Sequence, residues 1–288
     1  MVGQILWLTK STWNSGRADM SRKIAVIGDM HVGSPVGLFD QYKDDDGEWH
    51  HDHTEANRKL LEYWHEFWEW AETIGYDTVL LLADLCEGNN RKEFGRNLKI
   101  ADLDAQTGVA TRLLEPHTRG KKIYSVSGSK YHDSLDTSLD RKVTQDLGGE
   151  FHGLLSHLEI EGTGHVIQMA HGSGSGTMYR ESGAAREIMF MSMAADKKLA
   201  HDVHLMIRGH LHAYHYIESE ERAYLYNPGW KLFFPWAPLV KSYGKNLPTI
   251  GAVILDIDYD GIRVIKPRYR GKPFYPYFQY YDKLRGGK

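Results

Sequence analysis

The chain has a single cysteine, Cys86, among 288 residues, so no disulfide can form within it. No apolar run approaches the ~18 residues that a membrane span requires. The apolar centre ILWL near the N-terminus is too short for a signal peptide. A reducing compartment suits a protein without disulfides. We therefore predict a cytoplasmic protein that does not contact a membrane.

The chain also lacks an excess of either charge. Its 35 lysines and arginines nearly balance 38 aspartates and glutamates, and the net charge is −3 with histidine neutral. This balance is not that of a protein built to coat nucleic acid, although it is compatible with a local basic face. The sequence shows no linker, internal repeat or low-complexity segment. We predict one domain over residues 23–270, with an N-terminal extension (1–22) and a C-terminal tail (271–288).

Five short apolar runs have the length and composition of buried strands. They are KIAVIG (23–28), TVLLLA (78–83), KIYSVS (122–127), HVIQMA (165–170) and VHLMIR (203–208). Helical patterns separate them at 54–73, where Thr54 is the expected N-cap, and at 90–115, 134–147 and 179–200. Strands that alternate with helices predict a layered α/β core. Further strands are expected at 213–219, 222–229, 249–258 and 261–270, with a hairpin turn at Asp260-Gly261.

Every one of the five runs is followed by side chains that bind metals. The residues concerned are Asp29, His31, Asp84, His132, Asp133, His171, His210 and His212. Because sites in open α/β sheets form beyond the carboxyl ends of the strands, we expect these side chains to meet at one rim. If strand geometry persists, the two pairs spaced by two residues each point to one side. A single histidine at a strand end is usually a core or loop residue, but five strand ends of this kind favour a shared site.

The types of donor narrow the choice of ion. Imidazole and carboxylate together suit manganese, zinc, iron and nickel better than calcium or magnesium alone. Six donors around a central carboxylate exceed the needs of one tetrahedral ion. They suit two ions roughly 3.5–4 Å apart and bridged by Asp84. We therefore predict two divalent transition-metal ions, Mn²⁺ first, with Zn²⁺, Fe²⁺ and Ni²⁺ as the alternatives.

The ordered motifs resemble the calcineurin-like metallophosphoesterase family over about residues 23–230. The matching features are D-x-H at 29–31, Asp84 after an apolar run, a histidine at 132, H-G at 171–172, G-H-x-H at 209–212 and N-P-G at 227–229. The resemblance implies a four-layer α/β/β/α sandwich with a dinuclear metal site at the carboxyl ends of its strands. It implies one ion on Asp29, His31, Asp84 and His212, and another on Asp84, His171, His210 and an asparagine.

One motif departs from the family pattern. The usual G-N-H-[DE] is G-S-K-Y-H-D at 128–133, which is similar to phage- and prophage-type members and lacks the asparagine ligand. His132 then takes the place of the catalytic histidine, oriented by Asp133, or itself reaches the second ion. We favour the ligand role for His132 because Ser129 is a poor substitute ligand.

The motifs predict hydrolysis of phosphate esters, most simply of small or nucleotide-like diesters. The nucleophile is expected to be a hydroxide that bridges the metals, and a histidine is expected to protonate the leaving group. The absence of an evident cationic clamp near the motifs favours diesters over monoesters. Two alternatives stay open: a DNA or RNA nuclease, and a metal-binding interaction module without catalysis. The nuclease hypothesis is supported by basic residues that alternate as on one strand face and could contact phosphates. They are Arg263, Lys266, Arg268, Arg270 and Lys272.

Two further features each allow a structural and a functional interpretation. An aromatic cluster follows the last motif. We expect it to pack in the core or to form an oligomer contact; the functional alternative is stacking on a base or an aryl leaving group. It comprises Trp230, Phe233, Phe234 and Trp236. Glu87, three residues after Asp84, either supports the metal ligands or is a plain turn residue.

Overall fold

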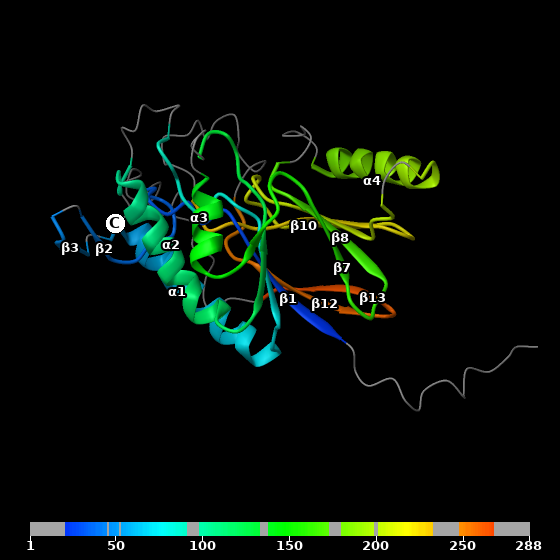
Figure 1. Ribbon diagram of the computed structural model, residues 1–288, viewed down its shortest axis with the longest axis horizontal. Coiled ribbons are helices and arrows are strands. Elements are labelled where there is room, and N and C mark those ends of the chain that lie inside the picture. Colours follow the sequence, from blue (N-terminus) through cyan, green and yellow to red (C-terminus); the bar gives the residue numbers. More distant parts are fainter. Residues whose placement is uncertain are drawn as a thin grey trace, which may run out of the picture.

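The computed structural model describes residues 21–44, 46–51, 53–90, 98–132, 138–172, 180–198, 201–232 and 248–267. Two β-sheets pack face to face, and helices cover their outer faces (Figure 1). The predicted extension and tail lie almost wholly outside the described residues. No helix among the described residues is both long enough and apolar enough to span a bilayer.

The first sheet has six strands and the second has five. In spatial order the first contains β13 (Gly261–Ile265), β12 (Val253–Asp258), β1 (Arg22–Ile27), β4 (Thr78–Leu81), β5 (Lys122–Ser125) and β6 (Glu150–Phe151). The second contains β10 (His215–Glu218), β11 (Ala223–Tyr226), β9 (Leu205–Arg208), β8 (His165–Ala170) and β7 (Ser156–Ile160). The neighbours β1 and β4 are parallel, as are β4 and β5, and β8 and β9. Their carboxyl ends therefore share an edge of each sheet.

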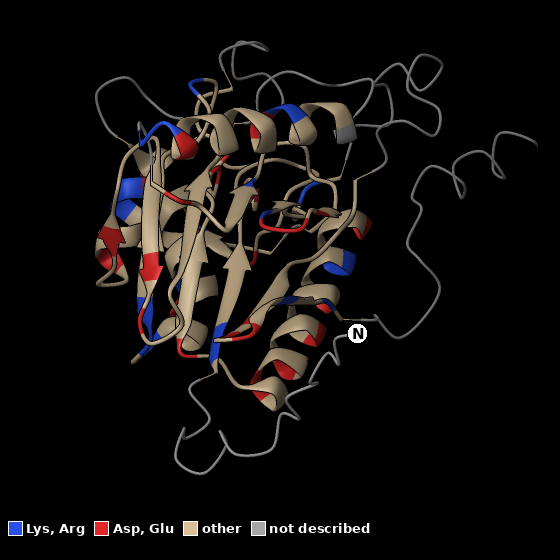
Figure 2. Ribbon diagram, turned by 90° about the vertical axis from the view of Figure 1, so that its right-hand side faces the viewer, with Lys and Arg blue, Asp and Glu red and all other residues tan. Residues whose placement is uncertain are grey.

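Alternate side chains of the strands build separate apolar layers. On β1, Ala25 and Ile27 pack beneath the helices α1 (Glu55–Ile74), α2 (Leu103–Thr118) and α3 (Leu139–Asp146). Ile24 and Val26 face the second sheet. The outer face of the second sheet packs against α4 (Arg180–Asp196). The strands carry few charged residues along their lengths (Figure 2). The described chain is thus the predicted α/β/β/α sandwich.

The sequence located the main elements and missed the short ones. All five apolar runs are strands, and Thr54 caps α1 through a reciprocal pair of hydrogen bonds with Asn57. The helix expected at 90–115 begins only at Leu103, after the N-cap Asp102. The edge strands β6 and β7 were not predicted, and neither was the small hairpin of β2 (Tyr42–Lys43) and β3 (Trp49–His50). These strands are too short or too polar to show an apolar run.

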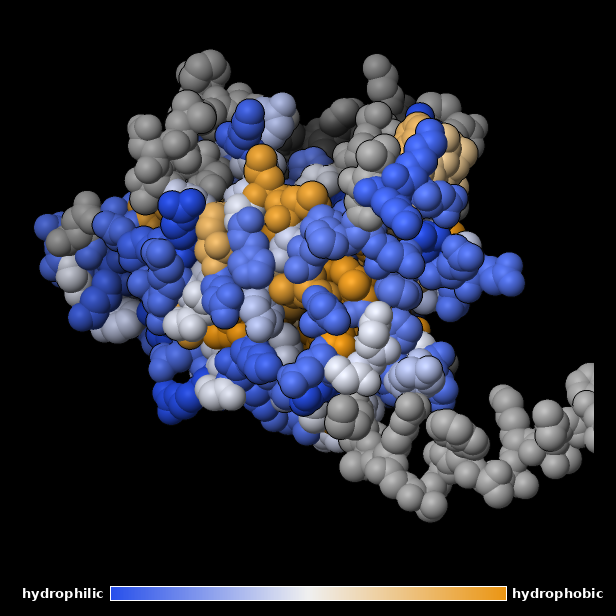
Figure 3. Space-filling model, turned by 45° about the vertical axis from the view of Figure 1, so that its right-hand side comes forward, coloured by the Kyte–Doolittle hydropathy of each residue, from blue (hydrophilic) through white to orange (hydrophobic). Residues whose placement is uncertain are grey.

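One cavity lies between the sheets at the end opposite the predicted metal site. It has a volume of about 150 Å³, and Arg22, Asp77 and Lys122 line it at the amino ends of β1, β4 and β5. The molecular face in Figure 3 is mostly hydrophilic around a central apolar patch. Because the predicted donors follow the carboxyl ends of the strands, this cavity is not the site that the motifs describe.

Candidate metal centre

Tight turns at the strand ends carry most of the predicted donors. Six residues there have a positive φ although none is glycine: Asp29 (53°), His31 (49°), Ala83 (65°), Asp84 (45°), His210 (68°) and His212 (47°). Strand geometry therefore does not persist through the two pairs, contrary to our expectation. Residues held in this sparsely populated region cost of order 1–3 kcal/mol each and cluster at functional sites. These backbone conformations lower the stability of the fold and set the directions of the side chains.

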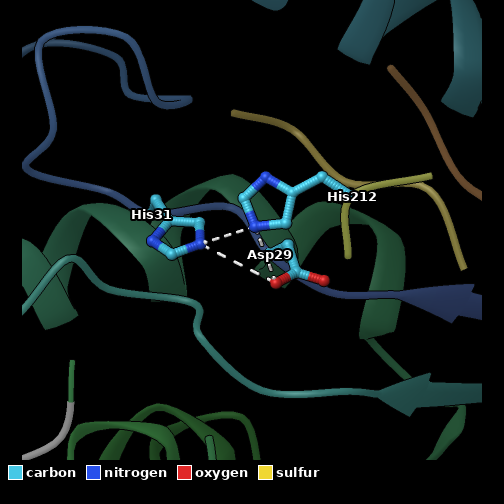
Figure 4. Close-up of side chains that lie close together, drawn as sticks. All are labelled: Asp29, His31 and His212. Carbon is cyan, nitrogen blue, oxygen red and sulfur yellow. Dashed lines mark hydrogen bonds and ion pairs between the residues drawn. The ribbon is translucent and has the colours of Figure 1, made fainter. Parts of the chain in front are cut away.

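The first group of donors consists of Asp29, His31 and His212 (Figure 4). Asp29 is fully buried, and its Oδ1 lies 3.1 Å from His212 Nε2 and 3.7 Å from His31 Nε2. The two histidine Nε2 atoms are 3.1 Å apart. Asp29 Oδ2 accepts a hydrogen bond from the backbone N–H of His210, which fixes the carboxylate against the last motif.

The second group consists of Asp84, His171 and His210. His171 Nδ1 lies 2.6 Å from the carbonyl oxygen of Leu82 and must donate to it, because a carbonyl only accepts. Its other ring nitrogen, Nε2, lies 2.8 Å from Asp84 Oδ2. Asp29 Oδ1 is 3.8 Å from the same Nε2, so the two groups adjoin.

The facing atoms of both groups fit metal ions. With Nδ1 protonated, a neutral His171 turns the lone pair of Nε2 toward a carboxylate oxygen. His31 does the same toward His212, because its Nδ1 donates to Glu87 Oε2 at 2.8 Å. Among the described residues, Asp84 Oδ2 and His171 Nε2 are buried without a hydrogen-bond partner. A cation can take the place of the proton on His171 Nε2, and separations of 2.8 and 3.1 Å suit neighbouring ligands at about 2.0–2.2 Å from one ion.

His132 lies with the first group rather than the second. Its Nδ1 donates to the carbonyl oxygen of Glu87 at 2.9 Å, and its ring stands edge-on to His31 with centroids 4.5 Å apart. Together with His31 and Glu87 it forms a third set of side chains that could hold a metal ion, and the Asp84 carboxylate also acts on it electrostatically. The ligand role that we favoured from the sequence stays a prediction; in the structure His132 is grouped with His31 and Glu87, and the second group contains Asp84, His171 and His210. Asp133, its expected orienting partner, lies outside the described residues.

Two residues that support the proposed ligands were not predicted from the sequence. The ammonium of Lys231 lies 2.7 Å from Glu87 Oε2, so Glu87 joins a lysine to His31. Asp140 accepts hydrogen bonds from the backbone N–H groups of Leu85 and Gly128, both at 3.0 Å, and so ties two turns of the site together. Neither residue stands in a recognisable motif. Glu87 supports a ligand, which was one of its two predicted readings.

Trp230 belongs to the core. It is fully buried and packs edge-on against Trp64 and Phe67, with ring centroids 5.0 and 5.9 Å away. Its backbone N–H donates to the carbonyl oxygen of Asp29. Phe233, Phe234 and Trp236, the rest of the aromatic cluster, lie outside the described residues.

Opposite charges shift the pKa values of the buried groups. Burial alone raises the pKa of the Asp29 and Asp84 carboxyls, but the neighbouring histidines outweigh it and hold both well below the usual range. Burial likewise lowers the pKa of His171, yet the carboxylates of Asp84 and Asp29 raise it to about 10. His31 and Lys231 lower the pKa of Glu87 to about 2 against the effect of burial. Without metal, the centre is therefore a set of buried ion pairs.

We expect metal binding to release a proton from His171. Its pKa near 10 keeps the ring protonated at neutral pH in the metal-free protein, whereas a metal ligand must be neutral. The apparent affinity for Mn²⁺ should thus rise with pH between about 6 and 9. Calorimetric titration in two buffers of different ionisation heat measures the protons released, and the absence of any release would contradict this reading.

The ion pair between His171 and Asp84 also affects the stability of the metal-free protein. Its contribution is complete below the ordinary histidine pKa of 6.5 and disappears as the pH rises through about 10. Thermal unfolding in a chelator should show this loss in the alkaline range.

Gly128 is packed against the second group. A Cβ atom there would lie 2.0 Å from Asp84 Oδ1 and 2.8 Å from Asp140 Oδ2. Gly128→Ala should therefore displace the turn and weaken Mn²⁺ binding by about tenfold or more, as losses of supporting contacts do. Gly108→Ala in α2 is the control, because nothing lies within 4 Å of its Cβ and alanine favours a helix by roughly 0.5–1 kcal/mol. Unchanged Mn²⁺ affinity in the Gly128 variant would refute this packing argument.

No family model and no curated protein matches the chain. Among solved structures it is similar to Vps29 from Entamoeba histolytica complexed with Zn²⁺, at 16% identity over 84% of this chain and 89% of that chain, with a TM-score of 0.41. An archaeal phosphodiesterase matches at 14% identity over 84% and 98% of the two chains, with a TM-score of 0.43. The phosphoesterase YfcE from E. coli matches at 14% identity over 81% and 88%, with a TM-score of 0.41. At such values these similarities carry no conclusion about activity, which must come from the site itself.

Proposed function

We propose that the protein is a metal-dependent hydrolase of phosphate esters, most simply a phosphodiesterase, that works with two divalent transition-metal ions. The observation that carries this proposal is the pair of adjoining, largely buried groups of carboxylate and imidazole donors. Asp29, His31 and His212 would hold one ion. Asp84, His171 and His210 would hold the other, and Asp84 would be shared between them.

The donor set suits Mn²⁺ first, because it combines imidazole with carboxylate oxygen. When bound, a pair of such ions supplies positive charge for the phosphoryl oxygens and a water of lowered pKa as the nucleophile. The protein's own part is to orient the ligands. Glu87 fixes the tautomer of His31, and the carbonyl of Leu82 fixes that of His171.

His132 is the candidate that acts on the leaving group. It is part-buried beside the first group, and its Nδ1 is held by the Glu87 carbonyl, which leaves Nε2 for a substrate. Burial, with His31 nearby, lowers the pKa of His132 to about 4, although the carboxylates of Asp84 and Glu87 oppose this. The negative charge of a bound ester would raise that pKa again, so that the ring can carry the proton it delivers.

The charges around the site favour diesters. Lys231 is already paired with Glu87, and Arg208 is buried in contact with Glu187 and Gln168. Neither cation is therefore available to a dianionic monoester. The basic strip gives a nuclease less support at Arg263, because Arg263 pairs with Asp256 and Asp258.

A turnover panel tests the proposed function. The chelator-treated protein is reconstituted with Mn²⁺, Zn²⁺, Ni²⁺ or Mg²⁺ and assayed on aryl phosphate mono-, di- and triesters and on a short oligonucleotide. We expect hydrolysis with Mn²⁺ and a higher kcat/KM on the diester than on the monoester. Metal binding without turnover of any ester would reject the enzyme in favour of an interaction module, and turnover of the oligonucleotide alone would favour the nuclease.

A further inference from the structure

Ser129 carries a buried hydroxyl beside the second donor group. Its Oγ has no hydrogen-bond partner within the part of the chain that the structure describes. Its backbone N–H donates to Asp84 Oδ1 at 2.9 Å. A buried hydroxyl without a partner costs free energy, so one this close to a ligand carboxylate calls for an explanation.

Hydrogen bonds hold the turn that carries Ser129 in place beside Asp84. The N–H of Gly128 donates to Asp140 Oδ2 at 3.0 Å, and Asp140 also accepts from the N–H of Leu85, next to Asp84. The close approach of Gly128 to Asp84 leaves no room for a side chain. Ser129 is therefore held against the ligand carboxylate by contacts on both sides.

The second group has an opening for such a donor. Its histidine and carboxylate members are Asp84, His171 and His210, whereas an ion of this kind takes at least four ligands, so an oxygen donor of another residue type can complete the set. His132 is grouped with His31 and Glu87 instead, and its Nδ1 is bound to the Glu87 carbonyl.

We propose that the Ser129 hydroxyl is an oxygen donor to the ion of the second group. This inference rests on the proposed dinuclear function and adds a ligand to it. A neutral hydroxyl is a weak ligand, and an oxygen donor favours Mn²⁺ or Mg²⁺ over softer ions. The second ion is consequently held less tightly than the first, and its occupancy follows the concentration of free Mn²⁺.

The test compares Ser129→Ala and Ser129→Cys with the full-length wild type in stepwise Mn²⁺ and Cd²⁺ titrations of the metal-free protein. Free Mn²⁺ is counted by electron paramagnetic resonance. The alanine variant should lose about tenfold or more in affinity at the weaker Mn²⁺ step and keep the tighter one. The cysteine variant should instead gain Cd²⁺ affinity at that step, since thiolate selects soft ions. A purely structural serine would not produce this reversal.

Ser34→Ala is the matched control. Its hydroxyl is also buried without a partner among the described residues, but its backbone bonds join it to His31 and Gly37 and not to Asp84, so the weaker Mn²⁺ step should stay unchanged. Wild-type constants in Ser129→Ala, together with no Cd²⁺ gain in Ser129→Cys, would overturn the role of Ser129 and leave the dinuclear centre standing. A wild-type protein that binds only one ion would overturn the dinuclear centre, and this proposal with it.

Discussion

Replacing Asp84 with asparagine is expected to abolish hydrolysis and weaken the binding of both ions. Asp84 Oδ2 faces His171 Nε2 at 2.8 Å, and Oδ1 accepts from the N–H of Ser129. An asparagine can keep the second contact through its amide oxygen. Its NH₂ group would then face His171 and donate to the lone pair that an ion needs. The variant therefore removes a negative charge and blocks a ligand while it preserves the shape.

The rate should fall by about 10³-fold or more, because the lost charge stabilisation amounts to several kcal/mol and each 1.36 kcal/mol is a factor of ten. Asp77→Asn is the matched control. Asp77 directly precedes the same strand at its other end, where it pairs with Arg22 at 3.5 Å, half-exposed. Its loss should leave kcat/KM and metal content unchanged. An Asp84 variant that keeps two ions and wild-type activity would show that Asp84 does not bridge them.

His132→Ala should separate substrates by their leaving groups. His132 is grouped with His31 and Glu87 rather than with Asp84, His171 and His210, so a variant that lacks only the leaving-group acid should keep both metals. It should lose about 10²–10⁴-fold in kcat on diesters with alkyl leaving groups, the usual contribution of general acid catalysis. Nitrophenyl diesters should suffer far less, because a good leaving group needs no proton.

His157→Ala is the control for His132. His157 lies on β7, on the second sheet, and contacts Gln168 instead of a metal-binding residue. Its removal should leave both substrate classes unaffected. If His132→Ala instead loses the second ion, and added Mn²⁺ restores the rate, His132 is a ligand as we first favoured from the sequence. That outcome would also contradict the role given to Ser129.

The sequence predicted which side chains come together where local patterns decide the geometry. Apolar runs become strands, parallel strands end at one edge, and the residues after them must meet there. That logic brought Asp29, Asp84 and His171 to one rim. It also predicted α1 with its cap, because capping depends on neighbours three residues apart.

Features set by distant parts of the chain were beyond such patterns. Lys231 contacts Glu87, which lies 144 positions earlier in the sequence. Strands of both sheets lie between them along the chain. The tight turns at Asp29 and His31 depend on hydrogen bonds from their N–H groups to carbonyls of the loop after β4. A spacing of two residues suggested extended strand, and only those tertiary contacts impose a positive φ. The position of His132 likewise depends on the Glu87 carbonyl, which no side-chain pattern reveals.

The most direct test of the central claim is a Mn²⁺ titration of the metal-free protein in which bound metal and diester hydrolysis are measured in the same samples. The two donor groups predict that binding saturates at two ions per chain, with little hydrolysis until the second ion binds. Full activity at one bound ion, or two bound ions without hydrolysis of any phosphate ester, would contradict it.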